Sequence, residues 1–214
     1  MKVKNLLAVA ALCLFSNSVS AQCPSWGGLY FHYSPTWLTS NYDNVDTEFF
    51  HGFTFGYNQS IGVAGDKVPL FLEVGGNFQY SLHTAKEYNV RSTAHLLTFN
   101  VPVNFGYSVR LGDKLALNPY VGIKMRLHLL GVETYDVKGA ENCNLFSKDD
   151  MGDERWNRFQ IGGQIGVKLI ISEAFFVETG YYMDFSPISN FDVKGGKNFR
   201  ARTSSVNFGF GYCW

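Results

Sequence analysis

The chain has 214 residues, enough for one domain or at most two small ones. Its formal net charge is zero, so the charge balance gives no indication of a nucleic-acid partner. Aromatic residues make up 16% of the chain and 22 residues are glycine, while no segment after the N-terminus is apolar over the length that a membrane-spanning helix needs.

The N-terminus has the pattern of a secretory signal peptide. Lys2 and Lys4 supply the positive charge, and residues 6–15 form an apolar segment that is too short to cross a bilayer. Val19 and Ala21 are the small residues expected at positions −3 and −1 of a cleavage site. We therefore predict cleavage after Ala21.

This cleavage would divide the chain into a signal peptide, residues 1–21, and one domain, residues 22–214. The mature protein would then enter an oxidising envelope compartment. A lipoprotein is an alternative, in which Cys23 would carry the lipid, although Gln22 fits poorly at the position before a lipidated cysteine.

The rest of the chain is a series of runs in which large apolar residues alternate with small or polar ones. In one run, Leu70 and Leu72 fall on one face while Glu73 and Gly75 fall on the other. A period of two residues is typical of β-strands. The predicted strands are residues 27–34, 49–60, 68–82, 94–111, 115–130, 158–171, 175–186 and 206–214.

The connections between these strands alternate between long and short. The long polar stretches are residues 35–47, 84–92, 132–156 and 187–202, and the short turns lie near residues 65–67, 112–114 and 172–174. The apolar faces carry almost no charge, whereas the opposite faces carry charge repeatedly. Transmembrane barrels have short periplasmic turns, long extracellular loops and alternating lipid-facing and lumen-facing residues. We predict an all-β fold, an eight-stranded antiparallel up-and-down transmembrane β-barrel with periplasmic termini.

The last strand has the clearest alternation. Phe208, Phe210, Tyr212 and Trp214 share one face, opposite Asn, Gly, Gly and Cys. An exposed aromatic edge of this kind promotes aggregation in water, but a closed barrel in lipid accommodates it. The alternatives are an amphipathic strand of a soluble sandwich and a lipocalin-like barrel, which would place its apolar faces inside.

This aromatic ending resembles the C-terminal signal that the assembly machinery reads in bacterial outer-membrane barrels. The whole mature chain resembles the small eight-stranded family that includes OmpX-like proteins, the OmpA transmembrane domain and the outer membrane protein β-barrel domain or porin family. The segment 97–120, with the turn Gly112-Asp113-Lys114, looks most like the last group. The resemblance implies a monomer in the outer membrane that contacts lipid and lipopolysaccharide, with no cofactor.

Strand parity places a set of charged residues of both signs in the lumen. These residues are His32, Glu73, Arg110, Lys124, Arg126, Lys168, Glu178 and Asp184. The interior of an eight-stranded barrel is just wide enough for side chains to fill it. We predict a packed polar network, and the alternative is a narrow channel in which the charged groups exchange partners.

The connections contain two further charged groups. One is acidic and could hold a divalent cation: Asp149, Asp150, Asp153 and Glu154. The other is basic and could meet lipid phosphates: Lys194, Lys197, Arg200 and Arg202. Ordinary solvation explains both groups equally simply, so we assign no metal site.

Cys23 lies just before the first strand and Cys213 near the end of the last one. Closure of an antiparallel barrel brings these strand ends together, so we predict a disulfide between Cys23 and Cys213 as one possible state of the seam. Cys143 would then remain unpaired.

His32-Tyr33-Ser34 matches a His-x-Ser spacing that one family of lipid A deacylases uses in a strand. No acidic partner for His32 is evident, so we assign no catalytic residue and predict that the protein is not an enzyme. We expect a structural or surface-interaction role, adhesion or recognition through the long loops, with an unidentified ligand. The alternative is a narrow channel for ions or small solutes.

Overall fold

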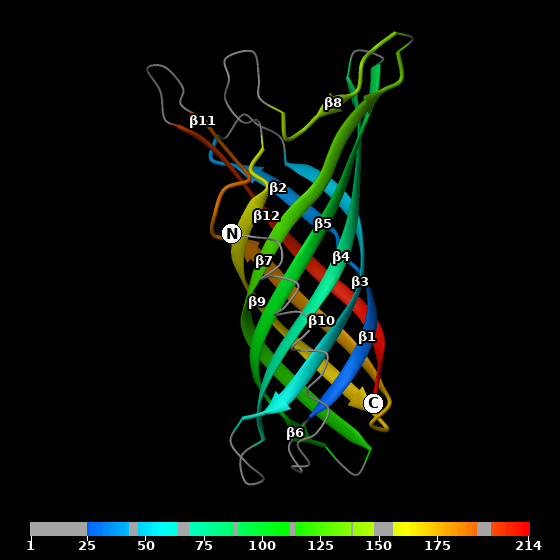
Figure 1. Ribbon diagram of the computed structural model, residues 1–214, viewed down its shortest axis with the longest axis vertical. Helices are drawn as coiled ribbons and strands as arrows, with labels where there is room; N and C mark the ends of the chain where they lie inside the picture. Colours follow the sequence, from blue (N-terminus) through cyan, green and yellow to red (C-terminus); the bar gives the residue numbers. More distant parts are fainter. Residues whose placement is uncertain are drawn as a thin grey trace, which may run out of the picture.

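The structure is a computed structural model that describes residues 25–42, 47–63, 69–87, 90–111, 114–137, 139–147, 156–191 and 198–214. Every regular element in these ranges is a β-strand (Figure 1). Across the same ranges, no helix is long and apolar enough to cross a membrane. The predicted signal peptide lies outside the described residues, so its cleavage site stays a prediction.

Nine longer strands and three short ones build the fold. The longer strands are β1 (Trp26–Tyr33), β2 (Thr36–Ser40), β3 (Glu48–Gly62), β4 (Leu70–Glu87), β5 (Val90–Tyr107), β7 (Leu115–Tyr135), β9 (Phe159–Ile171), β10 (Phe175–Asp184) and β12 (Phe199–Cys213). The short strands are β6 (Val109–Arg110), β8 (Cys143–Asn144) and β11 (Ser189–Phe191).

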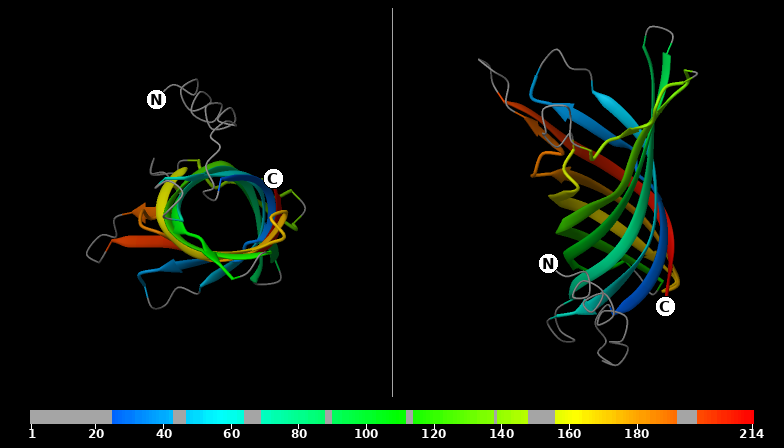
Figure 2. Two further views of the ribbon diagram at one scale, coloured as in Figure 1. Left: turned by 90° about the horizontal axis from the view of Figure 1, so that it is seen from below. Right: turned by 45° about the horizontal axis from the view of Figure 1, so that its top comes forward.

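The strands pair antiparallel and close into a ring of eight. β1 and β2 act as one strand, because both pair with β3 on one side and β12 on the other. They are interrupted at Pro35, which has no amide hydrogen for the ladder. The ring then runs β3, β4, β5, β7, β9, β10 and β12, and the view along the barrel in Figure 2 shows that it is closed.

The last strand seals the ring against the first. The ladder between β1 and β12 runs from Gly28 opposite Cys213 to Tyr33 opposite Phe208. It ends in a reciprocal backbone pair, in which the amides of Gly27 and Trp214 donate to each other's carbonyl oxygens at 3.1 and 3.0 Å. Closure leaves no open edge at this seam, as a structure surrounded by lipid requires.

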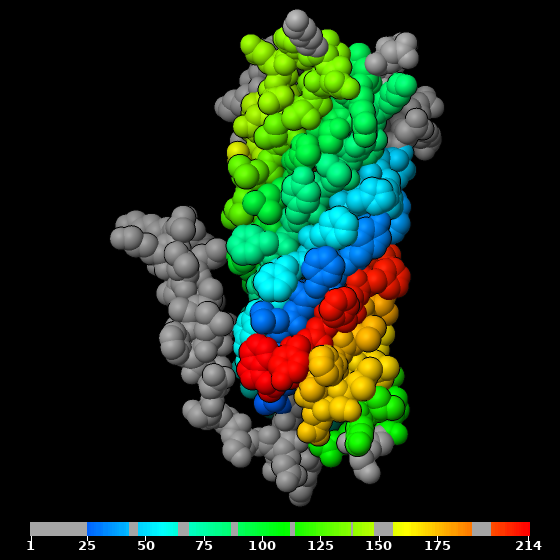
Figure 3. Space-filling view, turned by 90° about the vertical axis from the view of Figure 1, so that its right-hand side faces the viewer, coloured from blue at the N-terminus to red at the C-terminus, as the bar shows by residue number. Residues whose placement is uncertain are grey.

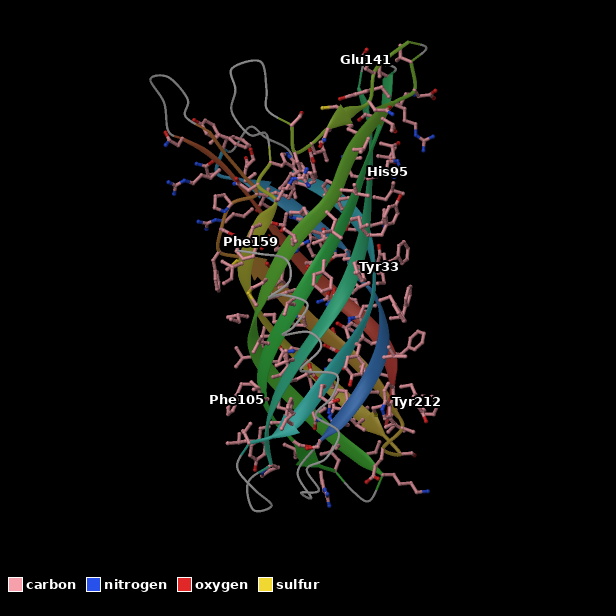
Figure 4. All side chains as sticks on the ribbon, in the orientation of Figure 1. Tyr33, His95, Phe105, Glu141, Phe159 and Tyr212 are labelled. Carbon is pink, nitrogen blue, oxygen red and sulfur yellow. The ribbon has the colours of Figure 1, made fainter. Side chains whose placement is uncertain are left out.

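Alternate residues face opposite sides of the ring, as the sequence predicts. Large apolar side chains cover the outside, and Phe105 and Tyr212 point away from the barrel in Figure 4. Phe210 on β12 keeps 65% of its surface exposed, whereas its lumen-facing neighbour Gly211 lies beneath the ring of Phe176. Buried polar side chains occupy the inside. The prediction of an eight-stranded antiparallel barrel is confirmed.

The strands are longer than predicted at the end opposite the C-terminus. The predicted loop at 84–92 is mostly a hairpin, in which β4 and β5 pair as far as Glu87 opposite Val90. β7 likewise continues to Tyr135, and β12 already begins at Phe199. Threonine and other β-branched residues suit strands even where the surroundings are polar, so polarity alone misplaced these boundaries. In Figure 1 two groups of strands, β4–β5–β7 and β2–β11–β12, rise above the ring.

Candidate functional site

A charge cluster occupies the middle of the lumen. The ammonium group of Lys168 on β9 contacts a carboxylate oxygen of Glu73 on β4 and lies 3.5 Å from Oε2 of Glu178 on β10. Two strands, β5 and β7, separate β4 from β9 in the ring. The ion pair between Lys168 and Glu73 therefore crosses the interior, where both residues are at most 1% exposed.

Aromatic rings and hydrogen bonds complete the surroundings of this cluster. The ammonium group of Lys168 lies 4.8, 5.5 and 5.4 Å from the ring centres of Trp26, Tyr120 and Phe176. The Tyr120 hydroxyl donates to Oε1 of Glu178 at 2.5 Å. Aromatic faces attract a desolvated cation, so the rings and carboxylates together stabilise a charge that would otherwise be costly to bury.

A second charge cluster lies nearer the extended strands. Arg126 on β7 contacts Asp184 on β10 at 3.3 Å and donates to the hydroxyl of Thr203 on β12 at 2.8 Å. The hydroxyls of Tyr182 and Thr203 also donate to Asp184. Buried carboxylates and guanidinium groups are stable only when they are paired and hydrogen-bonded, and this cluster meets that condition for Asp184.

Lys124 is the exception in this second cluster. Its ammonium group lies 4.3 Å from the ring centre of Tyr182. No carboxylate among the described residues lies within ion-pair distance of it. The lumen therefore contains one cation that is held by an aromatic face and not by a counter-ion.

Glycines make room for the large lumen side chains. A Cβ at Gly166 would overlap the Tyr120 hydroxyl, and a Cβ at Gly162 would overlap the Tyr182 ring or the backbone beside it. The glycines that recur on the predicted polar faces thus accept aromatic rings from other strands. This packing fills the interior and fixes the positions of the hydroxyls that serve the carboxylates.

Apolar clusters lie at both ends of the lumen. At the end where the C-terminus lies, the cluster consists of Trp26, Tyr30, Ile170, Phe176 and Cys213, with Ala116 packed against it. At the opposite mouth it consists of Phe50, Ala94 and Leu145, with Leu38 and Trp156 packed against it. The polar network therefore lies between two apolar caps.

A turn of the β7–β9 connection provides part of the upper cap. β8 pairs with β7, and the amide of Leu145 donates to the carbonyl oxygen of Gly131 at 3.0 Å. Phe146 stacks on His128 with a centroid distance of 5.7 Å, and the guanidinium of Arg158 lies 4.5 Å from its ring centre. We call Leu145 and Phe146 the mouth turn, since it folds over the lumen.

The structure buries most of the residues predicted to lie in the lumen. They are His32, Glu73, Lys124, Arg126, Lys168, Glu178 and Asp184. Arg110 differs from the prediction, because it is exposed in the short strand β6. β5 ends at Tyr107, where the amide of Ser108 donates to Pro69, and β6 pairs with β7 at the rim of the barrel, where both of its residues are exposed.

Sequence reasoning did not predict the contacts of the aromatic rings or the mouth turn. Tyr120 and Tyr182 fall on the polar faces of the alternating runs, and the structure buries both in the lumen, but alternation gives no indication that these rings contact the lumen charges. Leu145 and Phe146 lie in a stretch in which apolar and polar residues do not alternate regularly, so the sequence did not predict a strand or a buried position there.

The His-x-Ser pair is part of the lumen. Contrary to expectation, His32 has an acidic partner, since its Nε2 lies 3.4 Å from Oε2 of Glu178. Ser34 instead hydrogen-bonds to Thr54 at 2.9 Å. Both His32 and Ser34 are buried, with Tyr33 between them on the outer side.

Several other predicted site residues lie at the edge of the described ranges or outside them. Cys213 is buried with a free thiol, and its Sγ donates to the carbonyl oxygen of Glu173 at 3.6 Å. Cys23 lies outside the described residues, so the disulfide stays a prediction. The acidic group at 149–154, together with Lys194 and Lys197, also lies outside them, and the described residues contain no cluster of metal-ligating side chains.

The predicted assembly signal forms a continuous outward row on β12. Phe208, Phe210, Tyr212 and Trp214 are all at least half exposed. Trp214 also lies beside the rings of Tyr57 and Tyr212, with centroid distances of 6.1 Å to each. This geometry makes the row available to lipid or to another protein.

A closed antiparallel ring of eight strands, apolar outside and charged inside, defines a transmembrane β-barrel. The chain belongs to the outer membrane protein β-barrel domain family, whose model matches residues 7–212. It is accordingly an integral protein of the outer membrane.

Solved structures share this fold at low identity. Neisserial surface protein A has 10% identity and a TM-score of 0.52, over 87% of this chain and 96% of that one. Ail, the attachment invasion locus protein of Yersinia pestis, has 12% identity and a TM-score of 0.49, over 89% and 99%. No curated protein matches the chain.

Proposed function

We propose that the barrel is a closed membrane anchor that presents its strand extensions at the cell surface for adhesion or recognition. The observation that carries this proposal is the Lys168–Glu73 ion pair, which spans the lumen between two apolar caps. A solute would have to separate this buried pair, and an unpaired buried charge is strongly unfavourable.

The charge balance of the lumen supports a packed interior. The buried cations Lys124, Arg126 and Lys168 match the buried carboxylates Glu73, Glu178 and Asp184 in number. Apart from its histidines, this interior therefore has no net charge that would attract ions of one sign. Selective pores, by contrast, are lined by rings of like charge.

The extensions offer what a surface partner needs. Among the described residues, β4 pairs beyond Leu82 with β5 alone, and its other backbone edge could accept a further strand. Addition of a strand to an exposed sheet edge is a common mode of protein recognition. The partner we propose is a protein or peptide at the cell surface.

A narrow ion channel is the second candidate, and a specific observation favours it. Neither polar atom of the fully buried Asn118 side chain has a hydrogen-bond partner among the described residues, and Lys124 has no counter-ion there. Polar groups of this kind attract buried water, and connected waters could carry ions.

Conductance in planar bilayers separates the two candidates. The wild-type mature chain should show no discrete openings, whereas Lys168→Met together with Phe146→Ala should allow transient ones by removing the cross-lumen pair and the mouth turn. Phe105→Leu, a change on the lipid side, is the matched control. Steady openings of the wild type would reject the closed anchor.

The remaining features of the proposal follow from closure. We infer that the protein is a monomer, because the ring needs no second copy to cover its edges, and that the aromatic row ending at Trp214 is read by the assembly machinery. We also propose that it has no enzymatic role, since His32 and Ser34 are buried in the lumen network away from lipid. Loss of assembly in Trp214→Ala, but not in Phe105→Leu, would test the signal.

A further inference from the structure

The outward side of the β4–β5 extension carries a ladder of polar residues directly above the apolar belt. The pairs of this ladder, in order from the belt, are Leu82 opposite His95, Thr84 opposite Thr93, and Lys86 opposite Arg91. We call these six residues the outer ladder. β4 and β5 continue from the ring into the ladder, on the side of the barrel that faces the viewer in Figure 3, so we place the ladder at the level of the lipid headgroups.

The top of the ladder is a pair of like charges. Lys86 and Arg91 are directly opposite in the antiparallel register, and both are exposed. Neither forms an ion pair with a described carboxylate. Like charges directly opposite on a sheet are destabilising, so an anion bound between them would remove a cost present in the free protein.

The bottom of the ladder supplies a hydrogen-bond donor with a fixed orientation. The Tyr80 hydroxyl lies 2.6 Å from Nδ1 of His95, and an equivalent pair joins Tyr33 to His51 at 2.7 Å. When the tyrosine donates to Nδ1, the neutral imidazole carries its proton on Nε2. Nε2 of His95 can then donate to a hydroxyl or phosphate outside the barrel (Figure 4).

The height of the charged pair places it in the layer of lipid headgroups. Lys86 lies four residues beyond Leu82, which corresponds to about 13 Å along a strand. With a strand tilt of about 40°, the pair stands about 10 Å above the apolar boundary. At this height the pair lies within the layer of polar headgroups, where the phosphates and sugar oxygens of a glycolipid can reach it.

Charge is also segregated between the two sides of the extensions. Lys86, Arg91, Arg200 and Arg202 are exposed at outward-facing positions of β4, β5 and β12. Glu48 and Glu133 instead occupy lumen-side positions around the mouth, where Glu133 is opposite the buried Ala94. These four basic side chains thus face outward, whereas Glu48 and Glu133 do not; Asp136, whose amide donates to the carbonyl oxygen of Arg91 at 2.9 Å, is an exposed acidic residue close to the basic pair.

We propose that the outer ladder binds the phosphorylated sugar headgroup of a glycolipid in the outer leaflet. Lys86 and Arg91 hold the phosphate, while His95 and the two threonines donate to sugar oxygens. The site requires an outer-membrane barrel but does not depend on whether the lumen conducts. The proposal can therefore fail while the closed anchor holds, and the reverse is also true.

The test uses the refolded mature chain in phosphatidylcholine vesicles that contain a diphosphorylated glycolipid, lipid A, or its dephosphorylated form. Lipid A should raise the thermal unfolding midpoint of the wild type, and the dephosphorylated form should not. Lys86→Gln with Arg91→Gln should abolish most of that rise and weaken the apparent affinity about 10- to 30-fold. Lys114→Gln, an exposed lysine at the other end of the barrel, should keep the full rise.

Four results would overturn the proposal. The first is a wild-type response in the double variant, and the second is an equal loss of the response in Lys114→Gln. Phosphatidylglycerol at equal charge could match lipid A, which would indicate general attraction to anionic lipid. Inorganic phosphate could give the same shift without any lipid. Arg91→Lys, which keeps the charge, should retain most of the response, and all variants should unfold like the wild type in pure phosphatidylcholine.

Discussion

The same strands behave differently inside the ring and above it. Within the ring each strand has two neighbours, and lumen side chains such as Lys168 reach residues on strands across the barrel. Above the ring, β4 loses one neighbour beyond Leu82, and its outward side chains face solvent and headgroups. The two-residue alternation is common to both regions. They differ in whether the strands form a closed ring, and the period of the sequence does not distinguish them.

This difference indicates where substitutions are tolerated. In the ring, a change to one lumen residue leaves others without partners, because charge and volume are shared among several strands. In the extensions, an exposed residue touches one or two neighbours, so its chemistry can change without loss of the fold. The binding roles proposed above therefore suit the extensions, whereas the lumen residues chiefly hold the barrel together.

Removal of the central lumen cation should have the largest effect. Lys168→Met leaves Glu73 and Glu178 buried without their ammonium partner, which should lower the free energy of unfolding by about 3–5 kcal/mol. Urea unfolding in bilayers measures this. Lys86→Met, the matched change in the extension, should leave the unfolding curve unchanged. Equal losses of stability in Lys168→Met and Lys86→Met would contradict the difference between the ring and the extensions.

Removal of the upper cap should cost less. Leu145→Ala deletes buried apolar surface from the cluster with Phe50 and Ala94, and such truncations typically cost about 2–5 kcal/mol, with the low end expected at a partly solvated mouth. Hydrogen exchange at β8 should rise at the same time. Unchanged exchange with unchanged stability would show that the mouth turn does not hold the cap.

Enlargement of a lumen glycine should have the next largest effect on stability. Gly166→Ala would place a Cβ against the Tyr120 hydroxyl and is expected to cost about 1–3 kcal/mol as overpacking. Tyr120→Phe in the same chain should recover part of that loss. Gly76→Ala, on the outer side and 3.4 Å from the Phe99 ring, is the matched control and should be nearly neutral.

The tyrosine–histidine pair on the outer side should give the smallest effect. Tyr80→Phe removes one hydrogen bond at an exposed position, which should cost about 0.5–1 kcal/mol or less. NMR of the His95 imidazole should show a changed tautomer ratio in this variant. A loss of unfolding free energy as large as that of Lys168→Met would contradict the contrast, because it would mean that outward-facing residues depend on one another as strongly as the lumen residues do.

The sequence was sufficient to predict the ring but not its upper limits. Alternation in β4 and β12 distinguished the lumen face from the lipid face. A one-residue change in register would place Glu73 in lipid or Phe210 in the polar lumen, so only one assignment of the faces is possible. Partners across the lumen were beyond reach, since parity gives the face of Lys168 but not the strand opposite. The extent of β4 past Leu82 was missed because pairing with β5 satisfies its backbone whatever the polarity of its side chains.

The most direct test of the closed lumen is a double-mutant cycle between Glu73 and Lys168. Glu73→Gln, Lys168→Met and the double variant are each unfolded in urea in the same lipid. We predict that the summed losses of stability in the two single variants exceed the loss in the double variant by about 1.5 kcal/mol or more, because the double variant no longer buries a charge at Glu73 without its partner. Losses that simply add would contradict a cross-lumen ion pair and, with it, the packed interior.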